Sequence, residues 1–404
     1  MSISALPSAP RRTLSTGATT IYAAVTAISF SAASSAPTPL YHLYQEAMHL
    51  SPLTVTVIFA AYAFALMVTL LTVARLSDFV GRRPMILAGL LFSAAALVLF
   101  ITATSPLLLI LARLVQGVAV GIALTTLGAT MLDTDRQNGA LYNSITVFLG
   151  LTIGSLLAGV LVAFAPLPTQ LVYIVLLVVM GIEAAVLIVL PETATKRAGA
   201  LASLRPRVKV PAAARPVLLR LMPLNIASWA LGGFYLSLMP TLVSVATHTA
   251  SPFIGAGVVS ALMLTAAIAV PSLRRRQPAQ LLVISMTLLA TGIALTLLGA
   301  GLQSAAVMVG GTVVAGFGFG ASYSGVLRTL LPLADDTDRA GLLATYFVTS
   351  YLAFSLPAIA AGLLAPVLGL VATGYLYGAV LIGLIALSSL AMRHPHVREC
   401  AMGA

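Results

Sequence analysis

The 404-residue chain is 60% hydrophobic and only 8% charged, and it carries a formal net charge of +11. Soluble domains have about a quarter charged residues, so this composition excludes a water-soluble domain and predicts that the apolar stretches face lipid. The basic residues stand in short breaks between apolar runs, as membrane topology signals do, which argues against a nucleic-acid-binding surface.

Cysteine and histidine are too few and too scattered for a disulfide framework or a metal site. The single cysteine, Cys400, excludes an intrachain disulfide, and the five histidines form no metal-ligand cluster. No phosphate loop, nucleophile–base arrangement or cofactor motif occurs in the sequence. We therefore expect no enzyme activity, no cofactor, no metal and no direct use of ATP.

The apolar runs predict an all-α membrane protein. The basic segment PRRTLST before the first run weakly resembles a secretory or twin-arginine signal, but the many later runs indicate a short tail before an uncleaved first helix. A spanning helix needs about 20 apolar residues. Twelve runs meet this requirement, at 17–41, 52–75, 84–103, 106–131, 138–164, 169–190, 217–246, 252–272, 278–300, 303–331, 340–364 and 368–391.

The longest break between apolar runs lies at the middle of the chain and is rich in Pro, Ala and basic residues. It predicts a linker between two six-helix bundles. The expected organisation is an N-terminal tail at 1–16, a first bundle at 17–190, a linker at 191–216, a second bundle at 217–391 and a C-terminal tail at 392–404.

The basic residues also predict which side of the membrane each break faces. With twelve spans, all of the 21 Lys and Arg except Arg113 fall in breaks on one side or in the span ends next to those breaks, and Arg113 lies within the fourth span. Because cytoplasmic loops carry the excess of Lys and Arg, both termini are expected in the cytoplasm. We expect a multi-pass protein of the plasma membrane, or of the inner membrane in a bacterium.

The tetrapeptide DTDR occurs twice, 203 residues apart (336 − 133), and marks an internal repeat. Other matches in the same order are Gly117 with Gly320, Ala158-Gly159 with Ala361-Gly362, and Pro37-Thr38 with Pro240-Thr241. Since each half has an even number of spans, the halves are predicted to be parallel repeats with a substrate site between them near the midplane, and rocking of the halves gives alternating access.

The loop between the second and third spans reads ARLSDFVGRRPMI and resembles the G-x-L-x-D-x-x-G-R-[RK] signature of the major facilitator superfamily. Ala74 replaces the usual first Gly of that signature. The resemblance, which extends to drug and metabolite efflux members, implies the twelve-helix fold of that family. It also implies that this loop latches the outward-facing state by contacting the other half near the eleventh span.

The two DTDR copies lie in cytoplasmic loops, where their acids are expected to cap helix starts. We predict that Asp133 or Asp135 pairs with Arg82 or Arg83, and that Asp78 approaches Arg339. The alternative is a basic loop that only sets topology. The full candidate latch is Asp78, Gly81, Arg82, Arg83, Asp133, Asp135, Arg136 and Arg339.

The fourth and fifth spans carry further motifs of the family. ARLVQGVAVG resembles its R-x-x-Q-G pattern, and GLTIGSLLAG is similar to its antiporter motif, although Ser155 and Ala158 replace the usual Pro and Gly. These departures weaken the antiporter assignment, and simple helix packing is the alternative. Residues expected to allow close packing are Gly117, Gly121, Gly150, Gly154 and Gly159.

By analogy with the family, spans 1, 4, 7 and 10 line the cavity. The residues expected to handle substrate or protons there are Arg113, Gln116, Asn225, Trp229, Tyr235 and Tyr323. For Arg113 the alternative is a structural side chain bonded to backbone carbonyls. Glu183 is the one acid well inside a span and is the candidate proton carrier, with a role in helix contact as the alternative.

These features predict a secondary transporter whose cavity holds the cation of Arg113 and no carboxylate. We expect it to export small amphipathic molecules, neutral or anionic, in exchange for protons. The partners are a small-molecule substrate, protons and the lipid bilayer, with no nucleic acid and a monomeric state. Uptake of an organic acid or similar nutrient is the alternative direction. A non-transporting receptor or scaffold is the alternative from another class.

Overall fold

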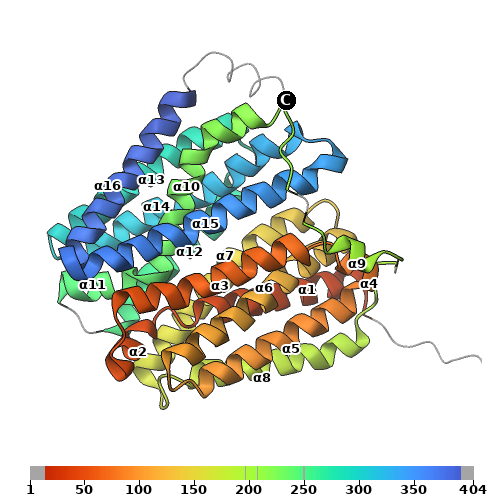
Figure 1. Ribbon diagram of the computed structural model, residues 1–404, viewed down its shortest axis with the longest axis horizontal. Helices are drawn as coiled ribbons and strands as arrows, with labels where there is room; N and C mark the ends of the chain where they lie inside the picture. Colours follow the sequence, from red (N-terminus) through yellow and green to blue (C-terminus); the bar gives the residue numbers. More distant parts are fainter. Residues whose placement is uncertain (1–13, 196, 207, 249–250, 393–404) are drawn as a thin grey trace, which may run out of the picture.

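The computed structural model describes residues 14–195, 197–206, 208–248 and 251–392, and these form a bundle of helices (Figure 1). In lipid every backbone polar group must be paired within the protein, which favours helices for apolar runs. The basic residues Lys196 and Arg207 lie outside the described residues, as do all of the expected tails except 14–16 and 392.

Twelve long helices fall in the described ranges. They are α1 (Thr16–Ser35), α3 (Pro52–Thr72), α5 (Arg82–Ile101), α6 (Pro106–Thr134), α7 (Gly139–Phe164), α8 (Leu171–Val186), α10 (Arg215–Ser237), α12 (Pro252–Ser272), α13 (Pro278–Gly301), α14 (Ala305–Leu330), α15 (Asp336–Leu368) and α16 (Leu370–Met392). Shorter elements are α2 (Tyr41–Met48), α4 (Ser77–Val80), α9 (Ala200–Ser203), α11 (Met239–Thr247) and the 3-10 turns η1 (Leu187–Val189) and η2 (Leu331–Leu333).

Eleven of these helices, with α8 extended through η1, are long and apolar enough to cross a membrane. The remaining one, α1, has 20 residues but includes four Thr and four Ser, which lower its hydropathy. Most of these hydroxyl-bearing residues are buried against other helices. The all-helical membrane fold expected from the sequence is therefore confirmed.

The first helix of each half is interrupted, and here the predicted boundaries were wrong. The expected span 17–41 ends at Ser35 and is followed by α2, while the expected span 217–246 is divided at Leu238 into α10 and α11. Both α2 and α11 end at a histidine in the left-handed conformation, His49 and His248, each with φ 52°. The polar sequence of α2, YHLYQEAM, is typical of a loop, which is why hydropathy alone missed this helix.

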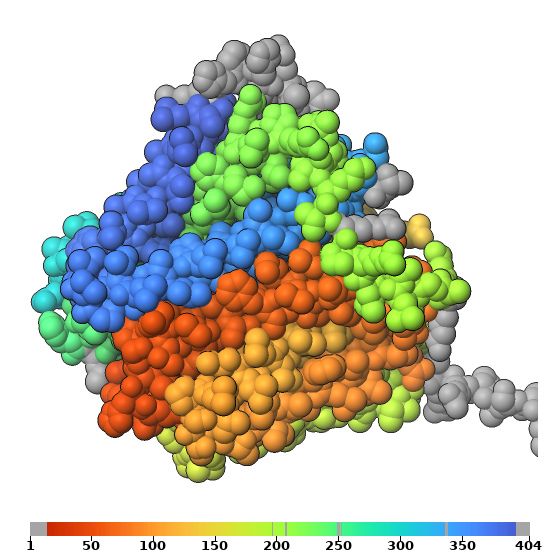
Figure 2. Space-filling view, viewed as in Figure 1, coloured from red at the N-terminus to blue at the C-terminus, as the bar shows by residue number. Residues whose placement is uncertain are grey.

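The two groups of six long helices meet along two main contacts. α7 packs on α12, and α15 packs on α3; Figure 2 shows the blue α15 lying along the orange α3. Helices α5, α8, α13 and α16 lie away from this interface (Figure 1). We call the end that carries residues 73–82, 133–138 and 190–214 the basic end, and the end that carries α2 and α11 the opposite end.

Glycines allow several helices to approach at backbone distance. A Cβ at Gly117 of α6 would lie 2.9 Å from the backbone nitrogen of Leu66 in α3, and one at Gly121 would lie 2.7 Å from Thr69. Both distances are too short for a real side chain. The pair that was expected to pack closely therefore joins α6 to α3.

The three expected glycines of α7 pack on two other helices. A Cβ at Gly150 would lie 2.5 Å from the carbonyl oxygen of Ile28, and one at Gly154 would lie 2.5 Å from the Cα of Ala32, both in α1. Gly159 instead faces Ala256 of α12, in the other half. Close packing accounts for all three positions without an antiporter role.

The substitution Gly117→Ala is expected to lower the melting temperature of the purified protein, because overpacking costs about 1–3 kcal/mol. Gly181→Ala is the matched control, since Gly181 in α8 has no neighbouring heavy atom within 4 Å. The control should be neutral or slightly stabilising, as alanine favours helix. Equal melting temperatures for the two variants in detergent would contradict the packing role of Gly117.

Candidate functional site

A cavity of about 410 Å³ lies between the two halves. Its wall comes from eight helices, α1, α3, α6, α7, α10, α12, α14 and α15. The lining residues are Ser31, Ser34, Phe59, Tyr62, Leu70, Ala74, Val120, Leu124, Thr125, Gly128, Ala129, Leu132, Asn143, Ser144, Val147, Phe148, Leu151, Trp229, Leu236, Met263, Phe319, Tyr323, Phe347, Tyr351 and Phe354.

Aromatic side chains are enriched in this wall. Nine of the 25 lining residues are aromatic, which is a much larger share than the 7% of aromatic residues in the whole chain. Three of them, Phe347, Tyr351 and Phe354, recur at the spacing of one helix face in α15. The indole of Trp229 packs against this face, with its centroid 5.1 Å from the ring of Tyr351 and 5.9 Å from that of Phe354.

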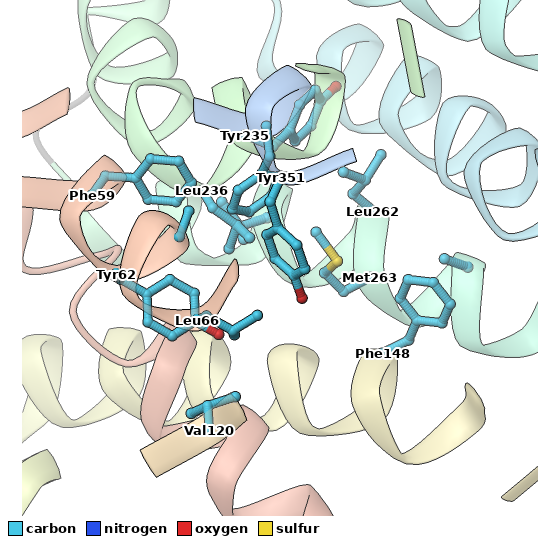
Figure 3. Close-up of a cluster of buried hydrophobic side chains, with 14 of the residues drawn as sticks. Phe59, Tyr62, Leu66, Val120, Phe148, Tyr235, Leu236, Leu262, Met263 and Tyr351 are labelled. Carbon is cyan, nitrogen blue, oxygen red and sulfur yellow. The ribbon is translucent and has the colours of Figure 1, made fainter. Parts of the chain in front are cut away.

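Aromatic contacts also join the two halves beside the cavity. The ring centroids of Phe59 and Phe354 are 4.9 Å apart, and Phe148 lies 5.7 Å from Phe319. Figure 3 shows Phe59 and Tyr62 on one side, Phe148 on the other and Tyr351 between them. The cavity is thus bounded by rings from both halves.

The polar part of the wall is small and uncharged. No Asp, Glu, Lys, Arg or His is among the described residues that line the cavity. The hydroxyls of Ser34 and Ser144 donate to carbonyl oxygens of their own helices. The Oδ1 atom of Asn143 is buried and has no hydrogen-bond partner within the described structure.

The halves are joined at the opposite end of the bundle. The Thr38 hydroxyl donates to the carbonyl oxygen of Leu236 at 3.0 Å. The Thr241 hydroxyl donates to the Gln45 side chain at 3.4 Å. With the contact between Gly159 and Ala256, these interactions close the cavity at that end.

At the basic end a second cavity of about 200 Å³ separates the halves. It lies between the end of α3 and the start of α15, and Ala74 and Ala340 are on its two sides. The central cavity reaches this region, since Ala74 and Phe347 line both spaces. The structure is therefore closed at the opposite end and parted at the basic end.

The structure places Arg113 outside the cavity wall, fully buried in the first half. Its Nη1 donates to the carbonyl oxygen of Ser34 at 2.8 Å and to Oε1 of Gln116 at 2.7 Å. Its Nε donates to the Tyr41 hydroxyl at 3.0 Å. The structural alternative describes this geometry better than the expected cavity charge, because neutral oxygens and rings enclose the guanidinium.

Three other expected cavity residues are also absent from its wall. Gln116 is fully buried and donates to the carbonyl oxygen of Ala33 at 2.8 Å. Asn225 donates to the Ser350 hydroxyl at 3.0 Å, which ties α10 to α15. Tyr235 bonds Thr312 inside the second half. Each is held by a partner within its own half, whereas the expected residues Trp229 and Tyr323 do line the cavity.

Sequence reasoning missed most of the wall on α3, α7 and α15. The spacing of Phe347, Tyr351 and Phe354 was a usable signal, because an aromatic face at i, i+4 and i+7 in an apolar helix needs something to face. No comparable pattern marked Asn143.

Glu183 is buried between α8 and α1, away from the central cavity. Its Oε1 accepts a hydrogen bond from the Ser29 hydroxyl at 2.6 Å, and its Oε2 has no partner among the described residues. The described residues contain no ion pair between Glu183 and Arg113. The contact with Ser29 fits the helix-contact interpretation.

At the basic end, Arg82 is the centre of a polar cluster. Its Nη1 donates to Ser77 and to Asp78, each at 2.6 Å, and its Nε donates to Asp133 at 3.0 Å. The predicted pairing of Asp133 with Arg82 is therefore present. All of these residues belong to the first half, so the cluster braces the loop 73–82 against the end of α6.

The start of the linker also binds this loop. Glu192 accepts hydrogen bonds from the backbone N–H groups of Arg82 at 2.6 Å and Arg83 at 3.1 Å, which caps α5. Gly81 has φ 108°, and a Cβ there would lie 2.6 Å from the Glu192 carboxylate. Arg83 donates to the carbonyl oxygen of Ile188 at 3.0 Å.

The other expected latch residues take separate positions. Asp135 accepts hydrogen bonds from the backbone N–H groups of Asn138 and Gln137, and the bond from Asn138 holds the pKa of the Asp135 carboxyl below its usual range. Arg136 is exposed in the same turn. The ion pairs of the described residues include none between Asp78 and Arg339, since the halves are parted here.

The second DTDR copy begins α15, whereas the first ends α6 and precedes α7. Asp338 in the second copy binds Lys209 of the linker at 2.8 Å. The backbone N–H of Lys209 also donates to the carbonyl oxygen of Gly341 at 3.4 Å. The two identical tetrapeptides therefore make different contacts.

Two helical halves around a central cavity are typical of membrane transporters. The sequence matches the model of the Major Facilitator Superfamily over residues 23–329, and the chain belongs to that family. It is thus a multi-pass secondary transporter of small molecules and not an enzyme. A search of curated proteins gave no match.

A solved structure shares the fold. The chain is similar to the crystal structure of a mutant of the nucleoside transporter NupG, with a TM-score of 0.71 and 13% identity. The alignment covers 92% of this chain and 99% of that chain. At this identity the similarity concerns the fold alone.

The substitution Gly81→Ala is expected to destabilise the protein by more than Gly199→Ala does. Both glycines have φ 108°, so both changes carry the strain of a positive φ, about 1–3 kcal/mol. The strain is larger at Gly81, where ψ is 157°, than at Gly199, where ψ is 16°. Only at Gly81 does the new Cβ also displace a carboxylate, whereas the nearest atom at Gly199 is Phe79 Cε1 at 3.5 Å. The measurement is the melting temperature of each variant. An equal decrease in the two variants would exclude a tight contact of Glu192 with Gly81.

Proposed function

We propose that this transporter exports small amphipathic molecules, neutral or anionic, in exchange for protons. The observation that carries the proposal is the central cavity, which is rich in aromatic residues, lacks charged residues in its described wall and opens toward the basic end. An aromatic and hydroxyl-bearing wall suits amphipathic ligands.

We assign the basic end to the cytoplasm, because Lys and Arg are enriched in cytoplasmic loops. On this assignment both termini are cytoplasmic and the molecule is inward-facing in the plasma membrane. The tails at 1–16 and 392–404 and the linker at 191–216 then flank two six-helix bundles at 17–190 and 217–391. The monomer contains the complete cavity, which supports a monomeric transporter.

The loop 73–82 is proposed to act as the latch when the basic end closes. Ala74 and Ala340 face each other across the gap, so closing it would bring Asp78 toward the start of α15. The Arg82 cluster and the Glu192 cap hold the loop in shape for this contact. In the inward-facing state the latch would be open, and the ion pairs of the described residues accordingly include none between Asp78 and Arg339.

Proton coupling requires a group that changes protonation during the cycle. Glu183 is proposed for this role, because it is a buried acid within a span and one of its carboxyl oxygens has no partner among the described residues. Its link to Ser29 connects it to α1, and Ser31 and Ser34 of the same helix line the cavity.

Flux in oriented vesicles tests direction and coupling together. A panel of anionic, cationic and neutral drugs should show export of neutral or anionic members that a pH gradient accelerates several-fold. Glu183→Gln should remove the gradient effect and retain slow exchange, and Glu46→Gln, the same change at an exposed acid, should leave it unchanged.

Gradient-driven uptake of an organic acid would instead establish the alternative direction, and preferential transport of quaternary ammonium compounds would exclude the proposed substrate class. A complete lack of flux across the panel would favour a receptor or scaffold.

A further inference from the structure

We propose that the central cavity selects an uncharged molecule with a planar aromatic ring, and that Asn143 accepts a hydrogen bond from its N–H or O–H group. The inference rests on the proposed function, because it takes this cavity as the substrate site. It narrows the neutral or anionic class to neutral ring compounds and names the residue that recognises them.

The lack of charge in the wall excludes ionised substrates on energetic grounds. An ion that leaves water for an apolar cavity needs a counter-ion or a full set of hydrogen bonds. The described wall offers neither an acid for a cation nor a base for an anion. The guanidinium of Arg113 lies 5.4 Å from the ring centroid of Tyr62, one of the lining residues.

Arg113 strengthens this selection against cations and gives little to anions. Its described polar contacts go to neutral oxygens, on Tyr41, Ser34 and Gln116, so its positive charge is not cancelled by a carboxylate within the described structure. A cation in the cavity would be repelled. An anion would be attracted by the same charge, but it would gain no direct hydrogen bond from Arg113, which is fully buried and not part of the described wall, so the loss of its water would not be offset.

The arrangement of rings explains the preference for a planar aromatic group. Trp229, Tyr351 and Phe354 form one face from the second half, with ring centroids 5.1–6.2 Å apart. Phe148 and Tyr323 form another, with centroids 5.5 Å apart. Aromatic rings gain edge-to-face and stacked contacts that a saturated ring of equal size does not. A cavity of about 410 Å³ accommodates one small ligand of this kind.

Asn143 supplies the polar end of the site. Its Oδ1 is buried without a partner, and buried polar atoms in proteins are almost always satisfied. Gly128 leaves the room for it, since a Cβ at that position would lie 2.8 Å from Oδ1. Because this oxygen is covered by its neighbours, the Asn143 amide would turn from Gly128 toward the cavity to accept a hydrogen bond from a donor on the substrate. Ser144 and Tyr323 line the cavity as further hydroxyl groups.

The test uses four ligands of similar size that differ in charge or in ring type, and benzoate, unlike the other three, also lacks an N–H donor. Benzamide is neutral and planar, benzoate is its anionic counterpart, benzamidinium its cationic counterpart, and cyclohexanecarboxamide is the saturated-ring control. Trp229 is the single tryptophan of the chain and lines the cavity, so its fluorescence in the full-length detergent-purified protein reports binding without any gradient. Melting temperature provides a second measure of binding.

We expect benzamide to bind at least tenfold more tightly than the other three ligands. Asn143→Ala should weaken benzamide binding about fivefold to tenfold, which is the net contribution of one hydrogen bond. Cyclohexanecarboxamide carries the same amide group, so its weak binding should fall by no larger factor. Asn225→Ala is the matched control, because Asn225 bonds Ser350 away from the cavity wall, and it should bind benzamide like the unmodified protein.

Equal or tighter binding of benzoate or benzamidinium would overturn the charge selection, and equal binding of cyclohexanecarboxamide would overturn the ring selection. An unchanged affinity in Asn143→Ala would overturn the role of Asn143. No response to any ligand by either measurement would overturn the proposal as a whole. Selective benzamide binding without flux of any panel compound would leave the inference standing and refute the transport proposal.

Discussion

The buried guanidinium of Arg113 fixes how the elements of the first half meet. It bonds the backbone of α1 at Ser34 and the Tyr41 hydroxyl at the start of α2, and its cation–π contacts include Tyr62 of α3 and Phe100 of α5. A charge inside a membrane protein persists only when such partners surround it. Because these contacts hold Arg113 behind Tyr62, the cavity wall on this side presents a ring and serine hydroxyls and no cation.

The neutral wall and the two unequal ends of the molecule fit the one mechanism proposed above, in which the halves rock about the cavity. Contacts such as Thr38 with Leu236 close the opposite end, while the gap between Ala74 and Ala340 leaves the basic end parted. Close glycine packing joins the helices inside the first half, and Gly159 adds a contact across the halves. Rigid halves with few polar contacts between them are suited to rocking around a bound ligand.

The sequence predicted the fold class and much of the basic end, because both depend on local signals. The positions of the spans were predicted from hydropathy and the basic end from the positions of Lys and Arg. The loop around Asp78 carries a specific motif. The cavity wall was harder to predict, since facing directions depend on how helices rotate against one another. A lone Arg in a span does not reveal whether it faces a cavity or Tyr41, and the polar helix α2 carries no hydropathy signal. Asn143 became a candidate only through its unpartnered oxygen.

Distances between spin labels test the central claim, that the halves rock about this cavity, most directly. In a Cys400→Ser background, one cysteine pair replaces Ala74 and Ala340 at the basic end, and a second pair replaces Gln45 and Thr241 at the opposite end. In reconstituted vesicles, addition of a transported ligand with a pH gradient should shorten the first distance and lengthen the second. Distances that stay fixed, or that change in the same direction at both ends, would contradict the account.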